Sequence, residues 1–139
     1  MALATFLQLI RPHTLQDQRA QRIYSAEVQQ VAARLRQVFD DWVALREVEP
    51  DNARLANAAA VYRWELMRLA KHIEELDPPR SLAGIQRGVH NAVLSSARAC
   101  QLLANGYRFH KSEAVCDGQA GLVKTVQDMS SLLTQLQLR

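Results

Sequence analysis

Hydrophobic residues recur in alternating steps of three and four along four segments of the chain. A mean step of 3.5 residues puts such positions on one side of an α-helix and favours left-handed packing between helices. The pattern therefore predicts four amphipathic helices. Their apolar positions are Tyr24, Val28, Val31, Leu35, Val38, Trp42 and Leu45; Leu55, Ala59, Tyr62, Leu66, Leu69, Ile73 and Leu76; Leu82, Ile85, Val89, Val93, Ser96, Cys100, Leu103 and Tyr107; and Val115, Leu122, Val126, Met129, Leu133 and Leu136.

Turn signals separate these segments. Pro50-Asp51-Asn52 ends the first and offers an acidic cap to the second. Asp77-Pro78-Pro79 ends the second, because the residue before a proline is pushed out of helical geometry, and Ser81 can cap the third. Asn105-Gly106 is typical of a helix C-terminus. We expect helices at about 15–48, 52–76, 80–105 and 112–137.

The connections between these helices are short, which makes consecutive helices antiparallel neighbours. The sequence thus predicts an all-α fold, an up-down-up-down antiparallel four-helix bundle over residues 14–139. Residues 1–13 fall outside the bundle pattern, and we expect a short N-terminal apolar extension there, a turn or short helix before Pro12.

Composition limits the alternatives. At 139 residues, 48% of them hydrophobic, the chain has the size and apolar content of one domain with its own core. Two cysteines cannot form a disulfide scaffold or a four-thiolate zinc site. No apolar stretch approaches the roughly 20 residues of a membrane helix, so we do not expect a transmembrane protein.

The net charge of +3 comes from one part of the chain. Residues 78–112 carry five basic side chains and no acidic one, and Arg80, Arg87 and Arg98 fall near one line of the third helix. This stripe is either an anion-binding surface or a solvated face balanced by acids of neighbouring helices. No aromatic residue interleaves the stripe, so nucleic acid is not the partner we expect.

Residues for catalysis are not evident. The chain has no Glu-x-x-His pair for a carboxylate-bridged metal site, no Gly-rich phosphate loop and no nucleophile elbow. His72 and His90 flank core positions and are candidates for metal or axial haem ligands; the alternative is two boundary histidines, each with one edge in water. We expect no enzyme activity, no metal and no cofactor.

Cys100 and Cys116 lie at matching heights across the turn between the third and fourth helices. Cys100 is on its apolar stripe, whereas Cys116 is one residue off and can face a neighbouring helix instead. A disulfide is one possibility in an exported protein; two buried free thiols are the expectation in a reducing cytoplasm.

An apolar remainder lies outside the four stripes. On the second helix, Trp64 and Met67 point away from the core positions. Their cover is the N-terminal segment with Phe6 and Leu7, a second protomer or a hydrophobic ligand, unless Trp64 is simply exposed. The first two can act together, if the N-terminal segment crosses onto a partner.

The run Leu76-Asp77-Pro78-Pro79, followed by His90 and a long Ala/Leu helix, resembles a pattern in uncharacterised bacterial helical-bundle proteins. The resemblance covers about residues 24–137 and implies a four-helix bundle, often exported or lipid-anchored, with no assigned activity. The chain begins without a basic, cleavable leader or a lipid-attachment cysteine. We expect a cytoplasmic protein as encoded, or an exported one if a leader has been removed.

The function that fits these features is a non-enzymatic binding module, homodimeric or bound to another protein. The contact would use the Trp64 face or the surface of the third helix. One alternative is a carrier of an apolar ligand or haem-like cofactor, and another is an anion-binding module that uses the arginine stripe.

Overall fold

The computed structural model describes the backbone of residues 2–138 and the side chains of residues 15–138. The described chain is helical throughout, apart from short connections, and contains no strand. Its elements are α1 (Ala2–Val48), α2 (Asn52–Glu74), the short 3-10 helix η1 (Arg80–Leu82), α3 (Ala83–Arg108) and α4 (Ser112–Gln137). The prediction of an all-α protein with four helices is confirmed.

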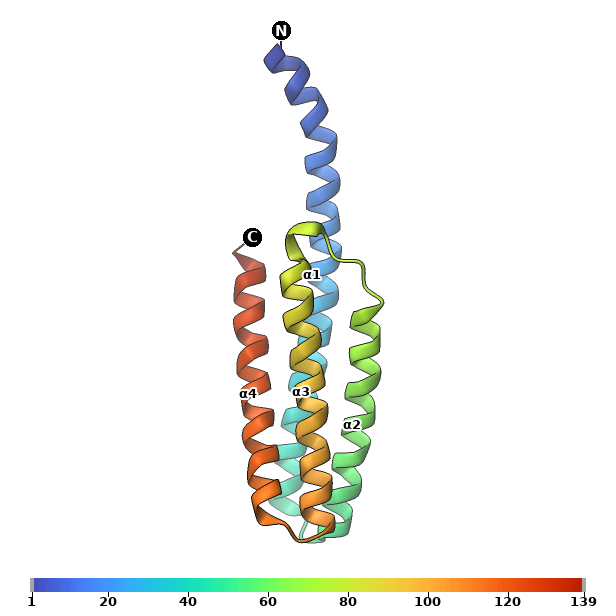
Figure 1. Ribbon diagram of the computed structural model, residues 1–139, viewed down its shortest axis with the longest axis vertical. Coiled ribbons are helices and arrows are strands. Elements are labelled where there is room, and N and C mark those ends of the chain that lie inside the picture. The colour runs from blue at the N-terminus through green and yellow to red at the C-terminus, as the bar shows by residue number, and fades with distance from the viewer. Residues whose placement is uncertain (1, 139) are drawn as a thin grey trace.

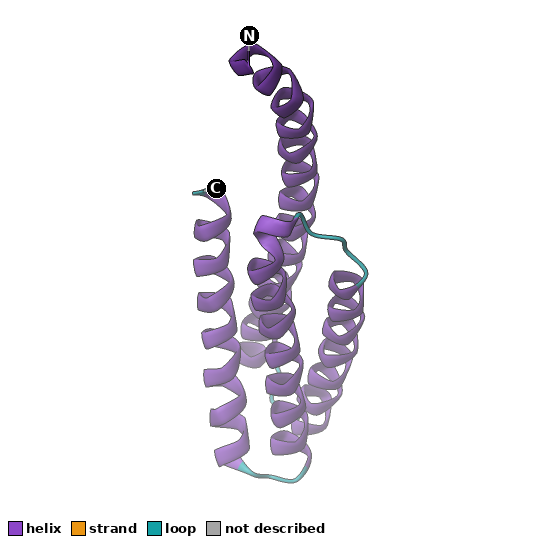
Figure 2. Cartoon of the chain, turned by 45° about the horizontal axis from the view of Figure 1, so that its top comes forward, coloured by secondary structure: helices purple, strands orange, loops and turns teal. Residues whose placement is uncertain are grey.

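The four α-helices lie side by side as a bundle (Figure 1). The α1–α2 and α3–α4 connections lie at one end, whereas the α2–α3 connection and the C-terminus lie at the other. The N-terminal part of α1 continues past this second end, as both Figure 1 and Figure 2 show.

The core consists of residues from the predicted apolar stripes. Trp42, Leu66 and Leu103 are fully buried and come from α1, α2 and α3, while Leu122 contributes from α4. Tyr107 packs its ring against Trp42 with the ring centroids 5.8 Å apart. Each buried large side chain contributes roughly 1.5–3 kcal/mol, so the shared core holds the four helices together.

The prediction of a separate segment over residues 1–13 differs from the structure, because α1 is continuous from Ala2 through Pro12. A proline inside a helix removes one backbone hydrogen bond and costs about 3 kcal/mol, which disfavours a helix without forbidding it. The three-and-four spacing also continues backward from Tyr24 to Ile10, Leu7 and Leu3. Polar residues occupy the intervening positions of this spacing, which interrupts the apolar pattern.

Helix boundaries shift near the two later turns. α2 ends at Glu74, before the expected residue 76. The third helix begins as η1, and Ser81 lies inside η1 without capping α3. Proline at positions 78 and 79 prevents an earlier helical start, because it restricts the backbone that precedes it.

The Asn105-Gly106 signal also has a different role from the expected helix end, because α3 continues to Arg108. A Cβ atom on Gly106 would lie 2.6 Å from Cγ2 of Val115 and 2.8 Å from its backbone nitrogen. Gly106 therefore allows α4 to approach α3 closely. The left-handed residue of this turn is His110, with a φ of 54°.

Candidate interaction surface

Three large apolar side chains are exposed on successive turns of α2. Val61 exposes 57% of its surface, Trp64 63% and Met67 43%. Their spacing of three residues puts them along one side of the helix, opposite the buried Leu66 and Ala59. We call Val61, Trp64 and Met67 the α2 outer face.

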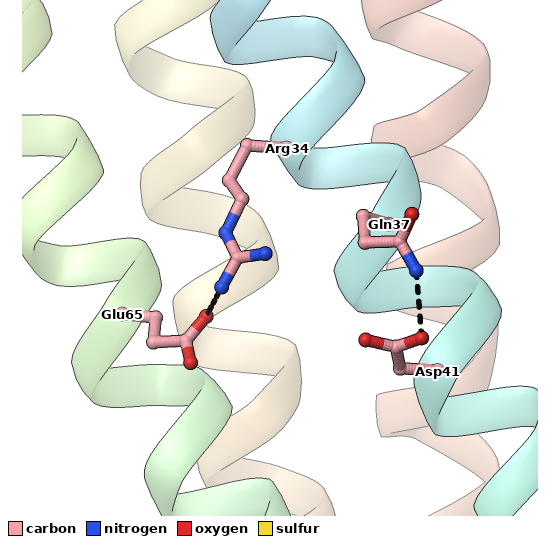
Figure 3. A network of polar contacts seen from close by, with 4 residues as sticks. All are labelled: Arg34, Gln37, Asp41 and Glu65. Carbon is pink, nitrogen blue, oxygen red and sulfur yellow. Dashed lines mark hydrogen bonds and ion pairs between the residues drawn. The ribbon is translucent and has the colours of Figure 1, made fainter.

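Charged side chains lie beside this face. The Arg68 guanidinium carbon lies 5.9 Å from the centroid of the Trp64 ring, within cation–π range. Glu65, next to Trp64 in sequence, pairs with Arg34 of α1 (Figure 3). This ion pair joins α1 to α2 beside Trp64, while the burial of Leu66 and Ala59 on the opposite side of α2 turns Trp64 outward.

The Arg34–Glu65 pair also influences a phenol beneath it. Burial, together with the carboxylates of Asp41 and Glu65, raises the pKa of Tyr62 above its ordinary value. Asp41 itself accepts a hydrogen bond from Gln37, one turn earlier in α1, at 2.8 Å (Figure 3). Burial is the largest of these causes, whereas the Arg34 guanidinium acts in the opposite direction and lowers the pKa of Tyr62.

The N-terminal segment does not reach the α2 outer face of its own chain. The side chains of Phe6 and Leu7 lie outside the described residues, but the backbone of this part of α1 projects beyond the bundle end (Figure 1). Trp64 thus stays exposed on the isolated chain.

The two candidate histidines lie on different helices in different surroundings. His72 on α2 is exposed, and its Nε2 lies 3.3 Å from a carboxylate oxygen of Glu27 on α1. His90 on α3 is half-buried. Among the residues whose side chains are described, no group of three or more His, Cys, Asp or Glu residues is placed to hold a metal ion.

The cysteines are both free thiols in the structure. Cys100 is buried and Cys116 is exposed, so the structure contains no disulfide between them. The position of Cys116 one residue off the α4 apolar stripe accounts for its exposure. The expectation of two buried free thiols in a reducing cytoplasm therefore holds for Cys100 and not for Cys116.

The three stripe arginines, Arg80, Arg87 and Arg98, are all exposed. None forms an ion pair with a carboxylate among the described side chains. The balancing acids expected for a solvated face are therefore not in contact with them, and the positive charge of the stripe is open to solvent.

An apolar groove between α1 and α4 was not anticipated from the sequence. It has a volume of about 300 Å³ and is lined by Ala32, Ala33 and Leu35 of α1 with Val126, Met129 and Leu133 of α4. The available signal was the pair of alanines in the middle of α1, because small side chains leave space between packed helices.

No described helix is long and apolar enough to cross a membrane. Comparison of the chain with protein-family models, curated proteins and solved structures finds no match.

Proposed function

We propose that the four helices form an up-down-up-down antiparallel bundle that acts as a non-enzymatic homodimeric binding module. The antiparallel arrangement is supported by the contacts between α1 and α2. Glu27 lies beside His72 and Arg34 beside Glu65, so moving forward along α1 corresponds to moving backward along α2. In the same way, Gly88 lies against Leu132 and Gly118 against Leu103 on α3 and α4.

The observation that carries the homodimer is the α2 outer face. Apolar surface gains roughly 25 cal/mol for each Å² removed from water, and tryptophan is enriched among the residues that dominate interfaces. Of the two tryptophans, Trp64 exposes 63% of its surface, whereas Trp42 exposes only 2%. A second copy that covers Trp64 would bury this surface.

The test is the molar mass of the full chain by light scattering over a range of concentrations. We expect a dimer, and we expect Val61→Asp to shift it toward monomer, because a buried unpaired carboxylate opposes association. The matched control is Val123→Asp on α4, where the native valine exposes 43% of its surface. Circular dichroism checks that both variants remain helical. A monomer at all concentrations would contradict the proposal.

A second candidate function is anion binding by Arg80, Arg87 and Arg98, supported by their exposure and lack of described carboxylate partners. Retention on heparin at low salt tests it. The double variant Arg87→Ala/Arg98→Ala should elute earlier than the native chain, whereas Arg36→Ala, whose native side chain pairs with Asp40, should not. Flow-through of the native chain would eliminate this candidate.

A further inference from the structure

The N-terminal part of α1 extends beyond the bundle as a single helix. We call residues 2–20 the α1 arm. Its described side chains, residues 15–20, are all exposed, with Leu15 at 63%. The arm passes the end of the bundle near Gln21, whose side chain lies 3.4 Å from the Ser81 hydroxyl of η1. From there the arm projects about 28 Å further.

The sequence of the arm requires a packing partner. The three-and-four spacing of the α1 core continues into Ile10, Leu7 and Leu3, with Phe6 beside them. A helix in water gains most of its stability from packing an apolar face against other structure. The bundle supplies no such surface to the N-terminal part of the arm, whose backbone lies beyond the bundle end (Figure 2).

The length of the arm matches the depth of Trp64 in the bundle. The Glu27–His72 contact shows that these two residues lie at the same height along the bundle axis. The Gln21–Ser81 contact marks the end of the bundle. At a rise of about 1.5 Å per residue, Trp64 lies roughly 21 Å inside this end and residues 6–7 lie roughly 22 Å beyond it. Two bundles placed end to end would therefore bring the apolar part of each arm beside Trp64 of the other.

We propose that the α1 arm docks on the α2 outer face of a second copy, so that an end-to-end dimer forms with two identical arm contacts. This inference rests on the proposed homodimer and specifies its interface. A twofold axis across the bundle ends runs each arm parallel to the partner's α2. In that register position 3 of the arm lies at about the same height as the partner's Val61, and position 10 at about the same height as the partner's Met67.

Charge at the bundle end favours a second copy as the occupant. Six charged side chains near the base of the arm and the end of α2 are exposed, and none of these six forms an ion pair with a described side chain. They are the basic Arg19, Arg22 and Arg80 and the acidic Glu74, Glu75 and Asp77. A twofold axis places the basic group of one protomer against the acidic group of the other, with Arg19 at the height of the partner's Asp77.

Interface size also favours the arm over direct contact between two α2 outer faces. A stable interface buries roughly 1,200–2,000 Å² in total, more than three partly exposed side chains on each protomer supply. Two helical arms and the bundle ends add the missing surface. One interface then covers Trp64 and provides the packing partner that the arm lacks.

Cysteine cross-linking distinguishes the arm contact from direct contact between α2 faces. In a Cys116→Ser background, a chain with Ile10→Cys is mixed with a chain carrying Met67→Cys and oxidised. We expect a covalent heterodimer at least fivefold above the level from a Val123→Cys partner chain. Neither Ile10→Cys nor Met67→Cys should link to itself. Self-linking of Met67→Cys alone would overturn the arm contact and leave the proposed homodimer intact.

Light scattering of full-length variants gives a second test. Leu7→Asp should raise the dimer dissociation constant at least tenfold. Thr5→Asp, about 200° around the helix from Leu7, should leave the constant within threefold. Equal effects of the two variants would overturn the arm contact. A native chain that is monomeric, or monomeric and bound to phosphatidylglycerol vesicles, would overturn both the arm contact and the homodimer.

Discussion

Gly118 on α4 lies directly against the backbone of Ala99 on α3. A Cβ atom on Gly118 would lie 2.8 Å from the Ala99 carbonyl oxygen and 2.7 Å from Cγ of Leu103. Because the backbone oxygen cannot move without disturbing α3, this contact requires glycine. The close approach of α3 and α4 therefore depends on a residue that would otherwise weaken a helix.

Gly118→Ala should lower the free energy of unfolding by about 1–3 kcal/mol, as expected for overpacking in a core. Gly84 provides the control, since a Cβ atom there would meet nothing within 4 Å. Gly84→Ala should raise stability by about 0.4–1 kcal/mol by restricting the unfolded chain. Urea unfolding followed by circular dichroism measures both. The same change in stability for the two variants would contradict the close α3–α4 contact.

Gln86 joins three helices through its side-chain amide. The Tyr24 hydroxyl donates a hydrogen bond to Oε1 of Gln86, and Nε2 of Gln86 donates one to the carbonyl of Ile73. Gln86→Ala should destabilise the protein by about 1–3 kcal/mol, because it leaves the Tyr24 hydroxyl of α1 without its acceptor and removes one of the donors to the Ile73 carbonyl of α2. Gln101→Ala is the control, because Gln101 only bonds to Asn105 within α3. Chemical denaturation of the two variants should show the larger loss for Gln86.

The two thiols should differ sharply in reactivity. Burial raises the pKa of Cys100 from 9.0 to about 12, whereas Cys116 is exposed. Since the thiolate is the reactive form, iodoacetamide at pH 8 should modify only Cys116 in the folded chain and both cysteines in denaturant. Mass spectrometry of the labelled chain reads this out. If instead both cysteines resist labelling in denaturant and react only after a reductant is added, the chain contains a Cys100–Cys116 disulfide.

Stability should decline in alkaline solution because two buried acids ionise more readily after unfolding. Burial raises the pKa of Cys100 from 9.0 and that of Tyr24 from 10.0, each to about 12. In the unfolded chain these groups lose their protons from about pH 9 upward, while the folded chain still holds them. The free energy of unfolding should therefore fall as pH rises from 9 to 12. Cys100→Ala should flatten the part of this decline near pH 9–10, as measured by urea unfolding at each pH.

The pattern of apolar positions by itself determined the helices and most of the core. Trp42, Leu66, Leu103 and Leu122 are all on predicted stripes and all buried, because a repeat of 3.5 residues leaves one side of a helix to be covered. The α4 bounds of 112–137 also agree with the structure. The outward direction of Trp64 followed from the same geometry.

Only the tertiary structure decided features that depend on contacts between helices. The continuity of α1 through Pro12 is a separate case, since this part of α1 lies beyond the bundle; proline weakens a helix by a finite amount that the surrounding turns can offset. The tertiary structure assigned Gly106 to close packing against Val115, since a glycine signal alone cannot distinguish a helix end from a missing side chain. It also fixed the register between α1 and α2, in which Glu27 lies beside His72. This register depends on packing between the helices and not on the spacing of residues within either one.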